Sequence, residues 1–353
     1  MLKRTSITYL NLTGTMFQDY DKSSLLFFDI ETTGLSPRSS YLYLIGALTW
    51  QNGAWVCTQW FAENYNEEPE LLKTFLSFSA PFKQIIHFNG DRFDIPYLKE
   101  KCHTYHLTDT LSTIISRDLF RMIRPLKKLL QLDSLKQKSL EQFLGNYRED
   151  PFTGGELIQV YQEYLETPSD SRLQCLLLHN YEDLLGMMSI LPMLSYHLIL
   201  SGSFQIANSE VNGDCLLVHA WLPLTLPKAF TYTEKEVTLF GEKDHISFQI
   251  EGIRDTLKYF FPDYKNYYYL PMEDIAIHKS LASFVDKDHR VPAKISTCYN
   301  KKKGFYLPQS EELFKPVFKK DYADKQMYFS CSEAFVQDRE RVQMYLQSIV
   351  SEL

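Results

Sequence analysis

The sequence lacks the features that would place it in a membrane, a secretory pathway or a cysteine-rich class. No stretch approaches the ~20 consecutive apolar residues of a bilayer span. The N-terminal string MLKRTSITYLNLTGTMF has no apolar core after its basic residues, so it is a poor signal peptide. The six cysteines are scattered and form no C-x-x-C pair, which argues against zinc-ribbon and iron–sulfur sites. We therefore expect free thiols, a cytoplasmic protein and no membrane partner.

The sequence also lacks an excess of positive charge. Its net charge of −7 is a weak argument against broad affinity for nucleic acid. The charge is uneven, however, because residues 116–138 carry seven Lys or Arg and two acids. Arg117, Arg121, Arg124 and Lys128 are spaced to share one helical face, which Pro125 interrupts. This segment is either a solvated amphipathic face or a ridge that follows phosphates beside an active site.

An acidic pair at the end of an apolar strand is the most informative feature that is present. Leu25–Phe28 is a continuous apolar run, typical of a strand buried on both faces. Asp29 and Glu31 follow at i and i+2, so their side chains project the same way. Two convergent carboxylates suit a hard divalent cation. The alternative is a strand that ends at the surface with two solvated acids.

The order of predicted elements favours an α/β layer with a mixed sheet, followed by a smaller α+β domain. We expect the first domain to cover residues 1–200 and the second residues 201–353. Residues 1–23 form an extension that includes an edge strand. The expected strands are 25–30, 41–50, 54–61 and 84–88, and the expected helices are 67–78, 94–101, 118–132, 139–145, 155–166 and 170–200, the last either one long helix or a pair broken at Pro192. In the second domain we expect hairpins over 237–250 and 294–307, a strand over 266–270 and a helix over 332–353.

Two further strings extend the acidic pattern. HFNGDRFDIPYLKEK contains Asp94, and LLLHNYEDLLGM contains Asp183. The order Asp, Glu, Asp, Asp resembles that of the DEDD superfamily of 3′-to-5′ exonucleases, which have a ribonuclease H-like fold. The spacing N-x4-D from Asn89 to Asp94 is similar to the second motif of that superfamily. The bacterial family often called YprB-like has, between the second and third motifs, a stretch similar to SLEQFLGNYREDPFTGGELIQVYQEYL of this sequence. Residues 24–200 therefore most resemble that family.

The resemblance implies a function and a metal site. It implies a two-metal nuclease that hydrolyses phosphodiester bonds, a 3′-to-5′ exonuclease on single-stranded DNA or RNA. Asp29 would bridge two ions, Glu31 and Asp183 would complete the water-activating site, and Asp94 would hold the second ion. Oxygen-only ligands favour Mg²⁺ or Mn²⁺ over zinc. The choice between DNA and RNA, and any protein partner, stay open.

His179 lies one helical turn before Asp183, so the two side chains share a face. A histidine there can accept a proton from attacking water near neutral pH. The superfamily usually has Tyr at i−4 or His at i−5 from the last acid, and this chain departs from both patterns. The alternative is a helix histidine satisfied by hydrogen bonds, although residues 173–188 are too apolar for a surface helix.

Several polar residues are candidates for substrate binding. Asn89 and Arg148 could contact a sugar or a phosphate, and Arg121 and Lys136 are further cationic candidates. For Asn89 a loop cap is an equal alternative, and Arg148 and the nearby Asp150 are as well suited to structural roles. The rival functions are an inactive nucleic-acid-binding module on the same fold, or an assembly protein that acts through its second domain. A degenerate module should have lost a metal ligand, and this sequence has lost none.

Overall fold

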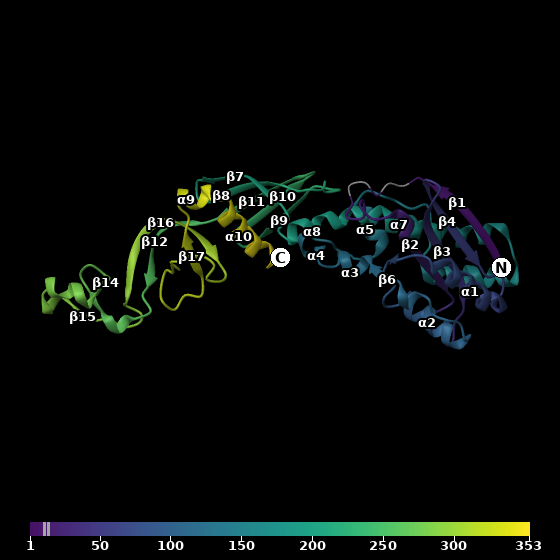
Figure 1. Ribbon diagram of the computed structural model, residues 1–353, viewed down its shortest axis with the longest axis horizontal. Coiled ribbons are helices and arrows are strands. Elements are labelled where there is room, and N and C mark those ends of the chain that lie inside the picture. Colours follow the sequence, from purple (N-terminus) through teal and green to yellow (C-terminus); the bar gives the residue numbers. More distant parts are fainter. Residues whose placement is uncertain (10–11, 13–14) are drawn as a thin grey trace. The chain divides into compact units, whose positions relative to one another are not determined.

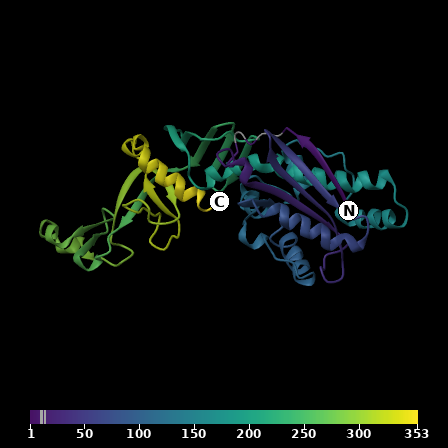
Figure 2. The same cartoon turned by 45° about the vertical axis from the view of Figure 1, so that its right-hand side comes forward.

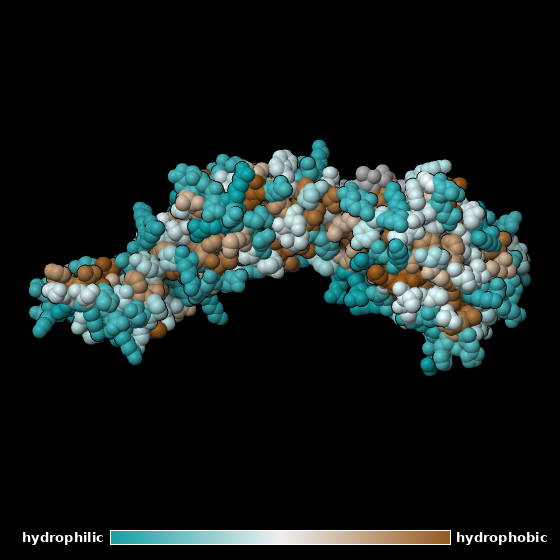
Figure 3. All heavy atoms as spheres, in the orientation of Figure 1, coloured by the Kyte–Doolittle hydropathy of each residue, from teal (hydrophilic) through white to brown (hydrophobic). Residues whose placement is uncertain are grey.

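The computed structural model describes residues 1–9, 12 and 15–353. Residues 10, 11, 13 and 14, in the expected N-terminal extension, lie outside the described residues. The chain divides into two compact units (Figure 1). The first contains Met1–His197 and Leu226–Lys228, and the second contains Leu198–Thr225 and Ala229–Leu353. In the space-filling view, hydrophilic residues cover much of the visible face and apolar residues form scattered patches (Figure 3).

The first unit is built on a mixed six-stranded sheet with the order β1-β4-β3-β2-β5-β6. The strands are β1 Leu2–Thr8, β2 Leu25–Thr32, β3 Leu42–Gln51, β4 Ala54–Phe61, β5 Gln84–His87 and β6 Ile115–Asp118. The pairs on the β1 side of β2 are antiparallel, whereas β2–β5 and β5–β6 are parallel. The predicted mixed sheet is therefore confirmed, and the extension supplies an edge strand, β1.

Helices cover both faces of this sheet (Figure 2). They include α1 Glu68–Ser79, α2 Asp94–Thr104, α5 Gln137–Phe143, α6 Gly154–Glu166 and α7 Asp170–Ile190. One core joins β2 to α1 and α2 through fully buried residues such as Phe28, Phe75 and Leu98. A second core on the other face joins Tyr43 and Phe61 to α6 and α7. The apolar run before Asp29 is buried because β2 lies between these two layers.

The segment from Asp170 to Leu200 is long and apolar enough to cross a bilayer by length and composition alone. It is broken after α7, where η4 Leu191–Tyr196 and α8 His197–Leu200 follow, so of the two alternatives the structure has the break at Pro192 and not one long helix. Sixty-one per cent of its most apolar window is buried within the structure. Burial of this kind is typical of the core helix of a folded domain, and α7 packs against β2, β3 and β4.

The predicted helical segment over 118–132 is confirmed in part, with the expected interruption at Pro125, but a single helical face that includes Arg117 is wrong. Arg117 lies on β6, and two short helices follow, α3 Leu119–Ile123 and α4 Leu126–Leu129. Asp118 ends the strand and caps α3 by accepting hydrogen bonds from the backbone N–H groups of Phe120 and Arg121. Pro125 then separates the two helices. The four cations therefore do not share one continuous helix.

The second unit consists mainly of antiparallel sheets. A five-stranded sheet has the order β7-β8-β11-β10-β9, and two three-stranded sheets have the orders β12-β16-β17 and β14-β13-β15. The strands are β7 Gln205–Asn212, β8 Cys215–Trp221, β9 Phe230–Glu234, β10 Val237–Glu242, β11 His245–Glu251, β12 Ile253–Phe260, β13 Tyr267–Leu270, β14 Ile275–His278, β15 Val291–Pro292, β16 Tyr299–Gln309 and β17 Met327–Ser330.

Some predictions for this unit are confirmed and others are wrong. The hairpin over 237–250 is confirmed as β10–β11, and the strand over 266–270 as β13. The hairpin over 294–307 is wrong, because β16 is one long strand that pairs with β12 and β17. The expected closing helix is divided into α9 Glu333–Gln337 and α10 Arg339–Val350, since Asp338 adopts an extended conformation and caps α10.

Candidate functional site

Strand β2 carries the first two acids into the interior of the first unit. Asp29 and Glu31 are two residues apart on this central strand, where Asp29 is opposite Gly46 of β3. The regular pairing with β3 shifts between Glu31 and Thr32, at the end of β2. Glu31 is only 8% exposed, so the reading of this pair as two solvated surface acids does not hold.

Asn180 of α7 holds the Asp29 carboxylate in place. Its Nδ2 donates a hydrogen bond to Asp29 Oδ2 at 3.0 Å, and its Oδ1 accepts one from Gln59 Nε2 at 2.9 Å. A Cβ atom on Gly46 would lie 2.0 Å from Asn180 Oδ1, so only glycine lets the helix approach β3 this closely. Asn180, which is fully buried, was not among the predicted site residues, although an amide within an apolar helical stretch is a signal that the sequence carries.

The turn after β5 carries Asn89 and Asp94. Asn89 has a positive φ of 60°, and its backbone N–H donates to Asp118 Oδ1 at 2.9 Å. Asp94 is the first residue of α2 and is buried. Burial raises the pKa of the Asp94 carboxyl to about 7, with repulsion from Asp118 and Asp183 adding to the effect, although backbone hydrogen bonds oppose it.

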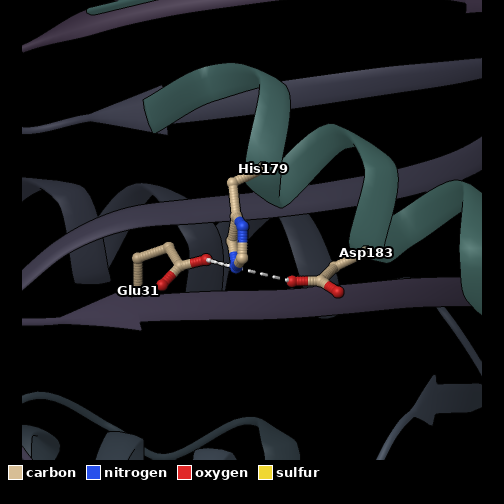
Figure 4. A group of neighbouring side chains, drawn as sticks. All are labelled: Glu31, His179 and Asp183. Carbon is tan, nitrogen blue, oxygen red and sulfur yellow. Dashed lines mark ion pairs between the residues drawn. The ribbon is translucent and has the colours of Figure 1, made fainter. Parts of the chain in front are cut away.

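Helix α7 carries His179 and Asp183 on one face, one turn apart (Figure 4). His179 Nε2 lies 3.3 Å from Asp183 Oδ2 and 3.7 Å from Glu31 Oε1. Ligand atoms of Glu31, His179 and Asp183 all lie within 4.8 Å of one another. The helix face predicted from the spacing therefore points at the acidic pair on β2.

The four acids act on one another electrostatically. Burial raises the pKa of Asp29 well above its ordinary value, and repulsion from Asp183, Glu31 and Asp94 raises it further. The pKa of Glu31 is raised for the same reasons, first by burial and then by repulsion from Asp183 and Asp94. Buried carboxylates in such excess favour the binding of a cation. The oxygen-rich donor set fits a hard divalent ion such as Mg²⁺ or Mn²⁺.

Asp150 contacts His179 at the ring nitrogen that does not face Glu31 and Asp183. Its Oδ2 lies 2.6 Å from His179 Nδ1 and 3.0 Å from Lys138 Nζ. Burial would raise the pKa of the Asp150 carboxyl, but hydrogen bonds from Lys138 and His179 outweigh it and hold that pKa below its ordinary value. Asp150 Oδ1 also accepts a hydrogen bond from the backbone N–H of Phe152, so Asp150 has a structural role in this loop as well. The contact with His179 was missed, because it joins residues 29 positions apart.

Arg148 contacts carboxylates in this structure. Its Nη1 donates to Asp183 Oδ1 at 2.6 Å, and its Nη2 and Nε donate to the two oxygens of Glu141 at 2.6 and 2.7 Å. The loop that carries Arg148 is fixed by Glu182, whose carboxylate accepts the backbone N–H groups of Glu149 and Asp150 at 2.9 Å. The role of Arg148 as a phosphate ligand stays a prediction.

The remaining substrate-binding candidates lie outside the acid cluster's own contacts. Arg121 is 69% exposed and pairs with Asp91 at 2.8 Å, and Lys136 is exposed. Asp91 belongs to a second acidic group with His87 and Asp118. There His87 Nδ1 accepts from the backbone N–H of Gly90, and its Nε2 faces the Ser116 hydroxyl at 2.7 Å. We interpret this group as the scaffold of the turn that leads to Asp94.

This combination of a mixed sheet, flanking helices and an acidic cluster beside the central strand defines a ribonuclease H-like domain. Residues 26–195 match the family model described as the RNase_H superfamily. The uncharacterized protein YprB of Bacillus subtilis (strain 168) is 26% identical over 175 residues. The match covers 48% of this chain and 42% of that protein, so the chain spans less than half of its relative's length. The resemblance to the YprB-like family is thereby confirmed.

Solved structures that resemble this chain include exonucleases. The family B DNA polymerase of Pyrobaculum calidifontis is 13% identical, with a TM-score of 0.39, and the match covers 69% of this chain and 35% of that one. A nuclease in its apo form is 21% identical, with a TM-score of 0.34, and the match covers 51% of this chain and 76% of that one. The EXO domain of Aedes aegypti Nibbler is 14% identical, with a TM-score of 0.34, and the match covers 52% of this chain and 84% of that one.

Proposed function

We propose that this protein is a nuclease that requires divalent cations and removes nucleotides from the 3′ end of single-stranded nucleic acid. The observation that carries the proposal is the convergence of four acids, Asp29, Glu31, Asp94 and Asp183, in the interior of a ribonuclease H-like domain, where two of them, Glu31 and Asp183, flank His179. Two Mg²⁺ or Mn²⁺ ions would supply an activated water and stabilise the charge that develops on the phosphate and the leaving oxygen.

The protein groups have distinct roles in this proposal. The four acids hold the cations, and Asn180 fixes the orientation of Asp29 through its hydrogen bond to Oδ2. His179 presents Nε2 between Glu31 and Asp183, where it can accept a proton from the attacking water. Asp150 accepts the hydrogen of Nδ1 and so leaves Nε2 as the nitrogen with a free lone pair. These contacts support a hydrolytic site better than a binding module that has lost its chemistry.

A time course on labelled oligonucleotides tests the proposal. Single-stranded DNA and RNA, labelled at the 5′ end, are incubated with the protein in Mn²⁺, Mg²⁺ or EDTA. We expect a ladder that shortens one nucleotide at a time with either metal and an intact band in EDTA. A 3′ label should be released at once as a mononucleotide. Intact substrate in every lane, together with tight binding of the oligonucleotide, would favour the inactive binding module instead.

Asp150→Asn should lower kcat by about 10- to 100-fold and leave KM nearly unchanged, the scale expected for a residue that orients a catalytic group. Asparagine keeps an oxygen for the Phe152 N–H but lacks the charge that holds His179. Steady-state hydrolysis of the oligonucleotide measures both constants. Lys138→Met is the control, because it removes another partner of the same carboxylate and leaves the bond to His179. Equal losses of kcat in the two variants would mean that Asp150 stabilises only the conformation of its own loop and does not orient His179.

A further inference from the structure

Arg148 is a cation inside the acid cluster. Its side chain is 8% exposed, and its guanidinium lies between Asp183, which is 20% exposed, and Glu141, which is 4% exposed. The contact with Glu141 is a two-pronged pair, in which Nε and Nη2 each donate to a separate oxygen. The contact with Asp183 uses only Nη1. Arg148 is therefore anchored on Glu141 and extends one N–H group to a candidate metal ligand.

Glu141 is held firmly against α7. Gln137 Nε2 donates to Glu141 Oε1 at 3.0 Å and to the backbone carbonyl of Asp183 at 2.8 Å. A Cβ atom on Gly186 would lie 1.9 Å from Glu141 Oε1, so a glycine at this position of α7 is what admits the carboxylate. This arrangement fixes the distance between Arg148 and the helix that carries Asp183.

Both carboxylate oxygens of Asp183 are engaged in this arrangement. Oδ1 accepts from Arg148 at 2.6 Å, and Oδ2 lies 3.3 Å from His179 Nε2. A divalent ion that uses Asp183 needs at least one of these oxygens. Since the bond to Glu141 does not involve Nη1, Arg148 can give up Oδ1 and keep its anchor. The guanidinium and a metal ion thus compete for the same atom.

We propose that Arg148 is an internal counter-cation that neutralises Asp183 until a divalent ion displaces it, so that this contact weakens and regulates metal binding. The inference rests on the proposed metal site and adds to it. It assigns to Arg148 a regulatory role rather than a direct contact with substrate phosphate. A hydrogen bond between charged groups is strong enough for its loss to change metal affinity by at least about tenfold.

Calorimetric titration of Mn²⁺ into the whole chain tests the proposal without substrate. Arg148→Gln should bind Mn²⁺ at least about tenfold more tightly than the parent protein. The double variant Arg148→Gln with Glu141→Gln should show the same gain, because it leaves no unpaired buried carboxylate and keeps the net charge of the site. Arg124→Gln, which removes an exposed arginine of the same unit, should leave the affinity unchanged.

The outcomes separate this proposal from the proposed function. If the parent binds no Mn²⁺ at millimolar concentration, or if Asp29→Asn binds as tightly as the parent, the metal site itself is wrong. If the parent binds and the double variant binds no more tightly, the role of Arg148 is overturned, whatever the single variant does. A gain in the single variant alone would be an effect of net charge. If the single variant does not fold, the double variant decides.

Discussion

Asp29→Asn is expected to abolish hydrolysis and, in the same molecule, to stabilise the metal-free protein. The loss of rate should be about 1,000-fold or more, the scale of removing a preorganised electrostatic group. The gain in stability has a separate cause. Burial and three neighbouring carboxylates disfavour the charge on Asp29, and asparagine removes that charge. An amide oxygen at the same place still accepts the hydrogen bond from Asn180.

Two measurements on one preparation check this pair of effects. Single-turnover hydrolysis with Mn²⁺ gives the rate, and urea unfolding in EDTA at pH 8 gives the free energy of unfolding. Asp133→Asn is the matched control, since Asp133 is exposed, and both quantities should stay at the parent values. A variant that loses activity and stability together would show that Asp29 supports the fold. An active variant would contradict its place in the metal site.

Asp29 and Glu31 were predictable from a local pattern, because they end a buried strand two residues apart. The spacing of His179 and Asp183 predicted that they share a helix face, whereas the assignment of Asp94 and Asp183 as metal ligands came from the resemblance to the DEDD superfamily. The supporting residues were not predictable in this way. Asn180 reaches Asp29 across 151 positions, and Arg148 reaches Asp183 across 35. Such contacts depend on how α7 and the loop before α6 pack on the sheet, which no periodicity records.

The basic segment shows how local signals compete. The spacing of Arg117, Arg121 and Arg124 matched a helix, but Asp118 is also a strong helix cap. In the structure Asp118 acts as the helix cap. Residues Ile115–Asp118 pair with β5 as a parallel strand, so the helix begins only after Asp118. Arg121 then pairs with Asp91 beside the turn that leads to Asp94. Pairing between strands distant in sequence therefore overrides the helical spacing.

In EDTA, the free energy of unfolding of the first unit should fall as the pH rises from 5 to 8. The pKa of Asp94 is about 7 in the folded protein and about 4 in an unfolded chain. Between these values the folded state binds more protons than the unfolded state, so raising the pH destabilises the fold. One such group contributes about 1.4 kcal/mol per pH unit across that window. Asp29 and Glu31, whose pKa values are also raised, change stability in the same direction.

Tryptophan fluorescence during urea unfolding can follow this change. In a Trp221→Phe background the remaining tryptophans, Trp50, Trp55 and Trp60, all lie in the first unit. Asp94→Asn in that background should flatten the pH dependence, because it removes the group that titrates near pH 7. The prediction would be contradicted if the free energy of unfolding of the parent protein in EDTA rose or stayed level between pH 5 and pH 8.

Saturating Mn²⁺ should cancel this fall in the free energy of unfolding between pH 5 and pH 8. A cation binds the ionised carboxylates of the folded state and not those of the unfolded chain. Its stabilisation of the folded state therefore grows as protons leave the site. The same buried charge that weakens the metal-free fold at pH 8 then becomes its ligand set. The divergence of the two curves as the pH rises, measured with and without Mn²⁺ on one protein, would therefore report the occupancy of the acid cluster independently of any substrate.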